Sequence, residues 1–79
     1  MRIEVLYFAS LRDASGVDQE SVEMTEGDAS QLFDQLNARH GFKLPRERLR
    51  VAINSEFADW HRQMVDGDEV AFIPPVSGG

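Results

Sequence analysis

The sequence predicts an α+β fold in which one main helix covers one face of a mixed sheet of four to five strands. Length supports this prediction, because 79 residues suffice for a single domain with one core. Patterning supports it as well. Residues 29–40 are apolar at helical spacing, whereas segments before and after them alternate with the period of strands. A helix with one apolar stripe can cover only one face of a sheet.

The first expected strand spans Arg2–Phe8 and becomes apolar on both faces toward its end. Such a strand belongs in the middle of a sheet, or one of its faces meets a partner. A short helical turn is expected at residues 9–14, with a stop at Ser15-Gly16, before a second strand at Ser21–Met24. Alternation places Ile3, Val5 and Tyr7 on the inner face of the first strand and Glu4, Leu6 and Phe8 on its outer face.

The main helix is predicted over Ala29–His40, because both of its ends carry clear signals. Asp28 and Gln31 have the spacing of a capping box, in which each side chain accepts a hydrogen bond from the backbone N–H of the other residue. Gly41 supplies a left-handed stop after the last turn. The apolar stripe of this helix consists of Ala29, Leu32, Phe33 and Leu36.

The rest of the domain supplies the remaining strands. Leu49–Ile53 alternates as a third strand and is followed by a turn at Asn54-Ser55, while Phe57–Trp60 is either a minor strand or a turn. Glu69–Ile73 is the last strand, and Pro74 ends it because proline cannot donate to a strand ladder. A last strand that pairs with the first completes a β-grasp (ubiquitin-like) roll, although other α+β orders fit the same periodicity.

Composition excludes several classes of function. The chain has no cysteine, which rules out a disulfide framework and cysteine-ligated zinc. Its net charge is −6, and its basic residues are scattered, so we expect no binding to nucleic acid. We expect a cytoplasmic protein with no membrane partner, since no signal peptide or membrane-length apolar segment is visible. No metal site is expected, because Asp66–Glu69 and the two isolated histidines lack metal-ligand spacing.

The sharpest functional signal is the C-terminus, where a domain of residues 1–75 is expected to give way to a flexible tail, residues 76–79, ending in Gly78-Gly79. Two terminal glycines arise by chance in about 0.5% of chains, and a disordered end or a cloning remnant has the same appearance. Chemistry offers a functional interpretation. A terminal carboxylate is ionised at neutral pH and can attack the α-phosphate of ATP, which activates it toward a sulfur nucleophile. Glycine lets the backbone enter a narrow cleft, while Pro74 and Pro75 stiffen the stem.

Three segments resemble the MoaD/ThiS family of sulfur carriers and, within it, the molybdopterin synthase small-subunit group. Phe8-Ala-Ser-Leu-Arg-Asp-Ala-Ser-Gly16 is similar to the Phe-Ala-x-x-Arg segment that follows the first strand in that group. Val51-Ala-Ile-Asn54 and the stretch from Asp66 to Gly79 are similar to the rest of the family pattern. The resemblance covers nearly the whole chain, and the first segment separates it from the thiamin-pathway carriers.

The resemblance implies a carrier subunit of a heterotetrameric synthase, which is not an enzyme on its own and binds no cofactor. An adenylating enzyme of the MoeB type would consume ATP to adenylate Gly79, which follows Gly78, and a sulfur donor protein would convert it to a thiocarboxylate. The tail would then enter the large subunit (MoaE-like), where the catalytic acid–base residues are expected. There the sulfur would pass to cyclic pyranopterin monophosphate in molybdenum cofactor biosynthesis.

Alternation also predicts a docking face at the root of the tail. Parallel pairing of the first and last strands would gather outward apolar side chains into a patch, unless a loop covers it or the register differs by one residue. Arg12 resembles a position of the family's motif, and it either holds the first loop or faces a partner. The predicted partner-binding residues are Leu6, Phe8, Arg12, Ala71, Ile73, Pro74, Pro75, Val76 and Ser77.

Two other functions stay open. The chain is compatible with a carrier for another pathway, such as thiamin synthesis, tRNA thiolation or protein conjugation, which would gain sulfur at Gly79 without yielding molybdopterin. It is also compatible with a ubiquitin-like interaction module, whose tail would gain no sulfur at all.

Overall fold

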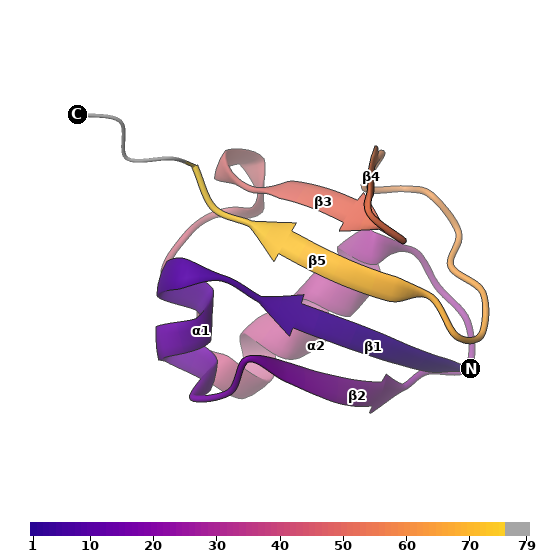
Figure 1. The fold of residues 1–79 in the computed structure, drawn as a ribbon, viewed down its shortest axis with the longest axis horizontal. Coiled ribbons are helices and arrows are strands. Elements are labelled where there is room, and N and C mark those ends of the chain that lie inside the picture. The colour runs from indigo at the N-terminus through magenta and orange to yellow at the C-terminus, as the bar shows by residue number, and fades with distance from the viewer. Residues whose placement is uncertain (76–79) are drawn as a thin grey trace.

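A mixed sheet of five strands, backed by one long helix, forms the body of the protein in the computed structural model, which describes residues 1–75 (Figure 1). The longer helix crosses one face of the sheet, and the described residues leave the opposite face open. The elements in chain order are β1 (Arg2–Tyr7), α1 (Ala9–Ser15), β2 (Gln19–Glu23), α2 (Ala29–His40), a 3₁₀ helix η1 (Arg46–Arg48), β3 (Arg50–Ile53), β4 (Glu56–Ala58) and β5 (Glu69–Ile73).

The strand order across the sheet is β2-β1-β5-β3-β4. The two strands β1 and β5 run parallel, with Val5 opposite Val70 and Tyr7 opposite Phe72. Antiparallel pairing joins β2 to β1, β3 to β5 and β4 to β3. This arrangement confirms the predicted β-grasp roll. Because parallel strands end at the same edge of a sheet, the chain leaves β5 beside the point where β1 leads into α1 (Figure 1).

The helix α2 begins and ends at the predicted residues. The Asp28 carboxylate accepts a hydrogen bond from the backbone N–H of Gln31, and the Gln31 side-chain oxygen accepts one from the N–H of Asp28, both at 2.9 Å. The bond from the Gln31 N–H, helped by His61, holds the pKa of Asp28 below its usual range. Gly41 closes the helix with a φ of 67°, and its N–H donates to the carbonyl of Asn37. Nearby residues therefore form hydrogen bonds with free backbone groups at both ends of α2.

The core lies between α2 and the inner face of the sheet. The ring of Phe33, on α2, lies 5.5 Å from the Phe72 ring and 5.7 Å from the Trp60 ring. Trp60 is only partly buried and stacks on Phe72 at 5.8 Å, so it closes the rim of the core. Burial, together with the nearby Glu20 carboxylate, raises the pKa of the Tyr7 phenol. The side chains that face inward from β1 and β5 are at most 2% exposed: Ile3, Val5, Tyr7, Val70 and Phe72.

The strand β2 differs from its predicted bounds, since it spans Gln19–Glu23 instead of Ser21–Met24. Leu6 of β1 pairs with Gln19, and the two strands continue in register to the pair of Arg2 with Glu23. Backbone pairing with β1 therefore sets the length of β2. Its polar first residues carry no strand signal of their own.

The segment after β3 is a strand, β4, which settles the choice that the sequence left open. Asn54 and Ser55 connect β3 to β4 with φ values of 54° and 71°. Two central residues with positive φ are typical of the tight turn that matches the twist of a hairpin. The turn places Phe57 opposite Ala52, which brings a large aromatic side chain to the open face.

Candidate functional site

The open face of the sheet has a polar end and an apolar end. At the polar end, Ser21 donates to the Glu4 carboxylate at 2.8 Å, and Arg2 pairs with the same carboxylate at 3.2 Å. The polar groups of these three side chains therefore bind one another. At the apolar end, Leu6 of β1 lies beside Ala71 of β5. The apolar end is also the edge at which β5 leaves the sheet, so the least polar part of this face adjoins the exit of the chain.

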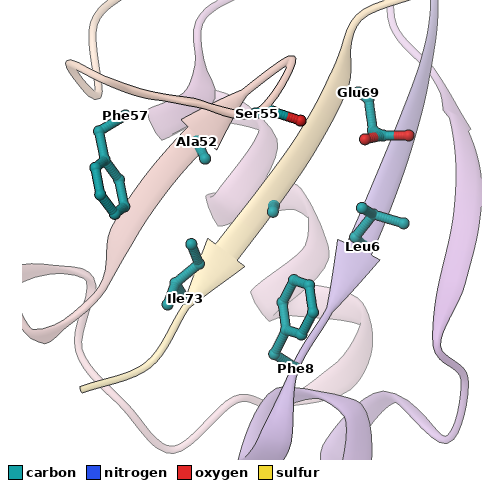
Figure 2. A pocket seen from close by; sticks show the side chains of 8 residues that line it. Leu6, Phe8, Ala52, Ser55, Phe57, Glu69 and Ile73 are labelled. Carbon is teal, nitrogen blue, oxygen red and sulfur yellow. The ribbon is translucent and has the colours of Figure 1, made fainter. Parts of the chain in front are cut away.

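The apolar end forms a groove of about 240 Å³ (Figure 2). Its floor consists of Ala71 of β5 and Ala52 of β3, which lie opposite each other in the sheet. Alanine at both positions leaves space between the larger side chains on either side. Figure 2 shows Phe8 and Leu6 on the β1 side of β5 and Phe57 on the β3 side. The lining residues are Leu6, Phe8, Ala52, Ser55, Phe57, Glu69, Ala71 and Ile73.

Four of the predicted docking residues lie together in this groove. Leu6, Phe8, Ala71 and Ile73 all line it, so the predicted register is confirmed and no loop within residues 1–75 covers them. Phe8 is 47% exposed, and Phe57 across the groove is 59% exposed. Two aromatic rings exposed beside one hollow are typical of a surface that binds protein. Their role in docking stays a prediction.

Backbone strain lies directly beside the groove. Ala9, the first residue of α1, has a φ of 49°, in the left-handed region that costs a residue with a Cβ roughly 1–2 kcal/mol. Phe8 before it is extended, with φ −126° and ψ 148°. The turn at Ala9 therefore directs α1 away from the sheet while Phe8 stays at the groove. Strain of this kind is often found at functional sites.

The stem of the predicted tail begins at the apolar end of the groove. Ile73 lines the groove, Pro74 is half-buried and Pro75 is exposed. The stem and the groove are therefore continuous. The other predicted tail residues, Val76, Ser77, Gly78 and Gly79, lie outside the described residues, as does the predicted flexible segment that they form.

Arg12 lies on α1 and does not line the groove. Its Nε is 3.8 Å from a carboxylate oxygen of Asp18, on the connection to β2, and both side chains are mostly exposed. An exposed ion pair of this length adds little stability. This geometry is compatible with Arg12 holding the first loop, and a contact with a partner stays a prediction.

Sequence reasoning missed half of the groove. A signal for Ala52 was available, because alternation puts Val51 and Ile53 inward and so turns Ala52 outward. No local pattern assigned Phe57 to this face, since its position depends on pairing with β3. Arg50 was missed as well, and its guanidinium carbon lies 3.7 Å from the centre of the Phe57 ring. The missed lining residues are Ala52, Ser55, Phe57 and Glu69.

The acidic segment Asp66–Glu69, at the start of β5, has a structural role. Asp68 is buried and accepts hydrogen bonds from the Asn54 side-chain amide at 2.9 Å and from the backbone N–H of Val65 at 2.8 Å. These bonds tie the β3–β4 turn to the start of β5. Within residues 1–75, no group of three histidine or acidic side chains is arranged to hold a metal ion. The helices of the same region are too short or too polar to cross a membrane.

Comparison with known proteins identifies the family. The model described as the ThiS family matches residues 5–79. The chain belongs to the ThiS family. This ThiS-family protein is 38% identical, over 86 residues, to the molybdopterin synthase sulfur carrier subunit of Mycobacterium tuberculosis, covering 100% of this chain and 99% of that protein. It is 36% identical to the human protein of the same name, covering 99% of this chain and 94% of that one.

Solved structures of similar proteins share the fold described above. SAMP1 from Haloferax volcanii matches with a TM-score of 0.83 and 27% identity, covering 100% of both chains. A chain in the complex of subunits 1 and 2 of the molybdopterin-converting factor from Helicobacter pylori matches with a TM-score of 0.73 and 25% identity, again covering 100% of both chains. The ThiS-family protein therefore shares its whole fold with proteins of this group.

Proposed function

We propose that this ThiS-family protein is the sulfur carrier subunit of a molybdopterin synthase and that its reacting group is the C-terminal carboxylate of Gly79. One structural observation carries the proposal. Parallel pairing of β1 and β5 places an exposed apolar groove at the root of the stem that leads to this carboxylate. Full-length similarity to sulfur carrier subunits of molybdopterin synthase supports the choice of pathway.

The chemistry would take place at the end of the chain and in partner proteins. An oxygen of the Gly79 carboxylate attacks the α-phosphate of ATP on the adenylating enzyme, and pyrophosphate leaves. A sulfide-level nucleophile from a sulfur donor protein attacks the acyl carbon, AMP leaves, and a thiocarboxylate remains. In the large subunit, the thiocarboxylate sulfur would bond to a carbon of cyclic pyranopterin monophosphate and displace an oxygen. Water would then hydrolyse the resulting thioester, which leaves the sulfur on the pterin and returns Gly79 to its carboxylate. The acid–base groups for that step would belong to the large subunit of the heterotetramer.

The folded body would deliver the tail to each partner. The groove adjoins the stem, so any protein that encloses the tail comes within reach of Phe8 and Ile73. The adenylating enzyme and the large subunit would therefore compete for one surface. Pro74 and Pro75 restrict the stem, so less conformational entropy is lost when the tail enters a cleft.

The proposal is tested by intact-mass measurement after incubation with an adenylating enzyme, ATP and a sulfur donor. We expect the mass gain of one oxygen-to-sulfur exchange, located at Gly79. A variant that lacks Gly79 is the matched control and should show no gain while it stays folded, because tail residues carry few contacts. A wild-type chain that gains no sulfur with competent partners would contradict the proposal.

A second candidate is a sulfur carrier for another pathway, and the similarity to SAMP1 favours considering it. Adding the large subunit and cyclic pyranopterin monophosphate to the thiocarboxylated protein separates the two functions. The molybdopterin synthase subunit should yield molybdopterin. A carrier for a different pathway should keep its sulfur under the same conditions.

A further inference from the structure

A positively charged side chain stands at the rim of the groove. Arg50 is the first residue of β3 and lies opposite Ile73, the last residue of β5. Its guanidinium carbon is 3.7 Å from the centre of the Phe57 ring. Ile73 and Phe57 both line the groove. The cation is therefore positioned at the apolar end, next to the root of the stem.

Stacking on Phe57 prepares Arg50 to bind an anion. A guanidinium is planar, and a ring that faces it occupies the flat side of the group. Its five N–H donors lie in the plane of the group, so a ring on the flat side leaves them open to a ligand. The stacked side chain has also lost part of its freedom, so less entropy remains to be lost when a ligand binds. A carboxylate, which accepts two parallel hydrogen bonds, matches this arrangement.

Within residues 1–75, three arginines (Arg2, Arg12 and Arg39) form ion pairs with carboxylates, whereas Arg50, like Arg46, Arg48 and Arg62, forms none. Arg39 lies 3.0 Å from Glu20, and Arg2 lies 3.2 Å from Glu4. Acidic residues outnumber basic ones by 14 to 8 in the whole sequence. Even so, none of the carboxylates in the described part of the chain forms an ion pair with Arg50.

The charge around Arg50 is also unlike that of the whole chain. Four of the eight basic residues lie in segment 43–50, with one acidic residue among them, whereas the net charge of the chain is −6. The sequence-based description of scattered basic residues overlooked this cluster. Pairing of β3 with β5 brings the end of the segment beside the exit of the stem. An acidic group of a partner would meet locally favourable charge there.

We propose that Arg50 binds a carboxylate of the partner protein that covers the groove. The fitting partner surface presents apolar side chains to the groove and an aspartate or glutamate at its rim, beside the path of the tail. This inference rests on the proposed function, because it requires that a partner covers the groove. Beyond the proposed function, Arg50 would select the partner by its charge. The partner surface would combine apolar side chains with a carboxylate.

The test measures the dissociation constant between the full-length protein and the purified large subunit of molybdopterin synthase, at low and high salt. Replacing Arg50 by glutamine should weaken binding about tenfold at low salt and reduce its salt dependence. Arg50→Lys keeps the charge but loses the planar pair of donors, so binding should weaken roughly threefold. The matched control is Arg62→Gln, an exposed arginine outside the groove, which should change binding less than about twofold.

A second variant tests the role of the aromatic ring. Phe57→Leu keeps the groove apolar but removes the flat surface under Arg50, so Arg50→Gln should cost less in this background than in the wild type. Equal effects of Arg50→Gln and Arg62→Gln would overturn the inference. The proposed docking surface survives that result if Ile73→Asp still abolishes binding. If the wild-type protein does not bind the large subunit at all, both the docking surface and the role of Arg50 are wrong.

Discussion

The two faces of the sheet use the same strands for different purposes. On the covered face, Val70 and Phe72 of β5 are fully buried against α2 and its neighbours. On the open face, Ile73 remains partly exposed at the groove. Burial of Phe72 stabilises the folded chain, whereas burial of Ile73 becomes complete only if a partner covers it. Adjacent residues of one strand can therefore control folding and binding separately.

The largest expected effect is on the covered face. Phe72→Ala should lower the free energy of unfolding by about 3–5 kcal/mol, because it leaves a cavity among Phe33, Trp60 and the sheet. Urea denaturation measures this change. Ile73→Ala, one residue along the strand, should cost no more than about 1.5 kcal/mol, since its side chain is partly in water already. Equal losses for the two variants would mean that the two faces do not differ as described.

The next effect concerns the open face. Phe8→Asp or Ile73→Asp should weaken binding to both the adenylating enzyme and the large subunit at least about tenfold, because a charge would be buried in an apolar contact. Circular dichroism should show an unchanged fold. Val65→Asp is the matched control, because Val65 is 65% exposed and lies outside the groove. Unfolding of the Phe8 and Ile73 variants would assign these residues to the core.

A smaller effect is expected at the start of α2. Asp28→Ala removes the cap and should cost about 1 kcal/mol of stability. Because folding lowers the pKa of Asp28, its charged form stabilises the fold fully at pH values above the unfolded pKa of about 3.8. That contribution is lost as the pH falls below this value and through the folded pKa. Asp28→Asn keeps a capping oxygen without a charge, so its unfolding curves should lack this acid-dependent component.

The smallest effect concerns the strained residue beside Phe8. Ala9→Gly should raise the free energy of unfolding by about 0.5–1 kcal/mol, because glycine adopts a φ of 49° without a Cβ clash. Ala14→Gly, at an exposed position in the same helix, should lower it by a similar amount. Thermal unfolding of both variants shows whether each change raises or lowers the stability of the fold. Destabilisation by Ala9→Gly would show that the left-handed conformation carries no strain.

Elements with strong local signals were predicted from the sequence with their correct bounds. The capping box at Asp28 and the stop at Gly41 defined α2, and the alternating run Glu69–Ile73 followed by proline defined β5. The first residues of β2 were missed, because Gln19 has no strand signal and is held by pairing with Leu6. Caps, stops and alternation depend on neighbouring residues, so the sequence shows them directly. Pairing between strands depends on residues far apart in the chain, so no local pattern predicts it.

The same distinction applies to the groove. The sequence alone determined the faces of β1 and β5, because side chains of a strand alternate, and it supplied the Gly78-Gly79 pair that follows the last strand. Only the tertiary structure decided which strands lie side by side. That pairing brought Ala52 beside Ala71, Phe57 opposite Ala52, and Arg50 over the Phe57 ring. Periodicity assigns a side chain to a face, but hydrogen bonding between distant strands chooses its neighbours.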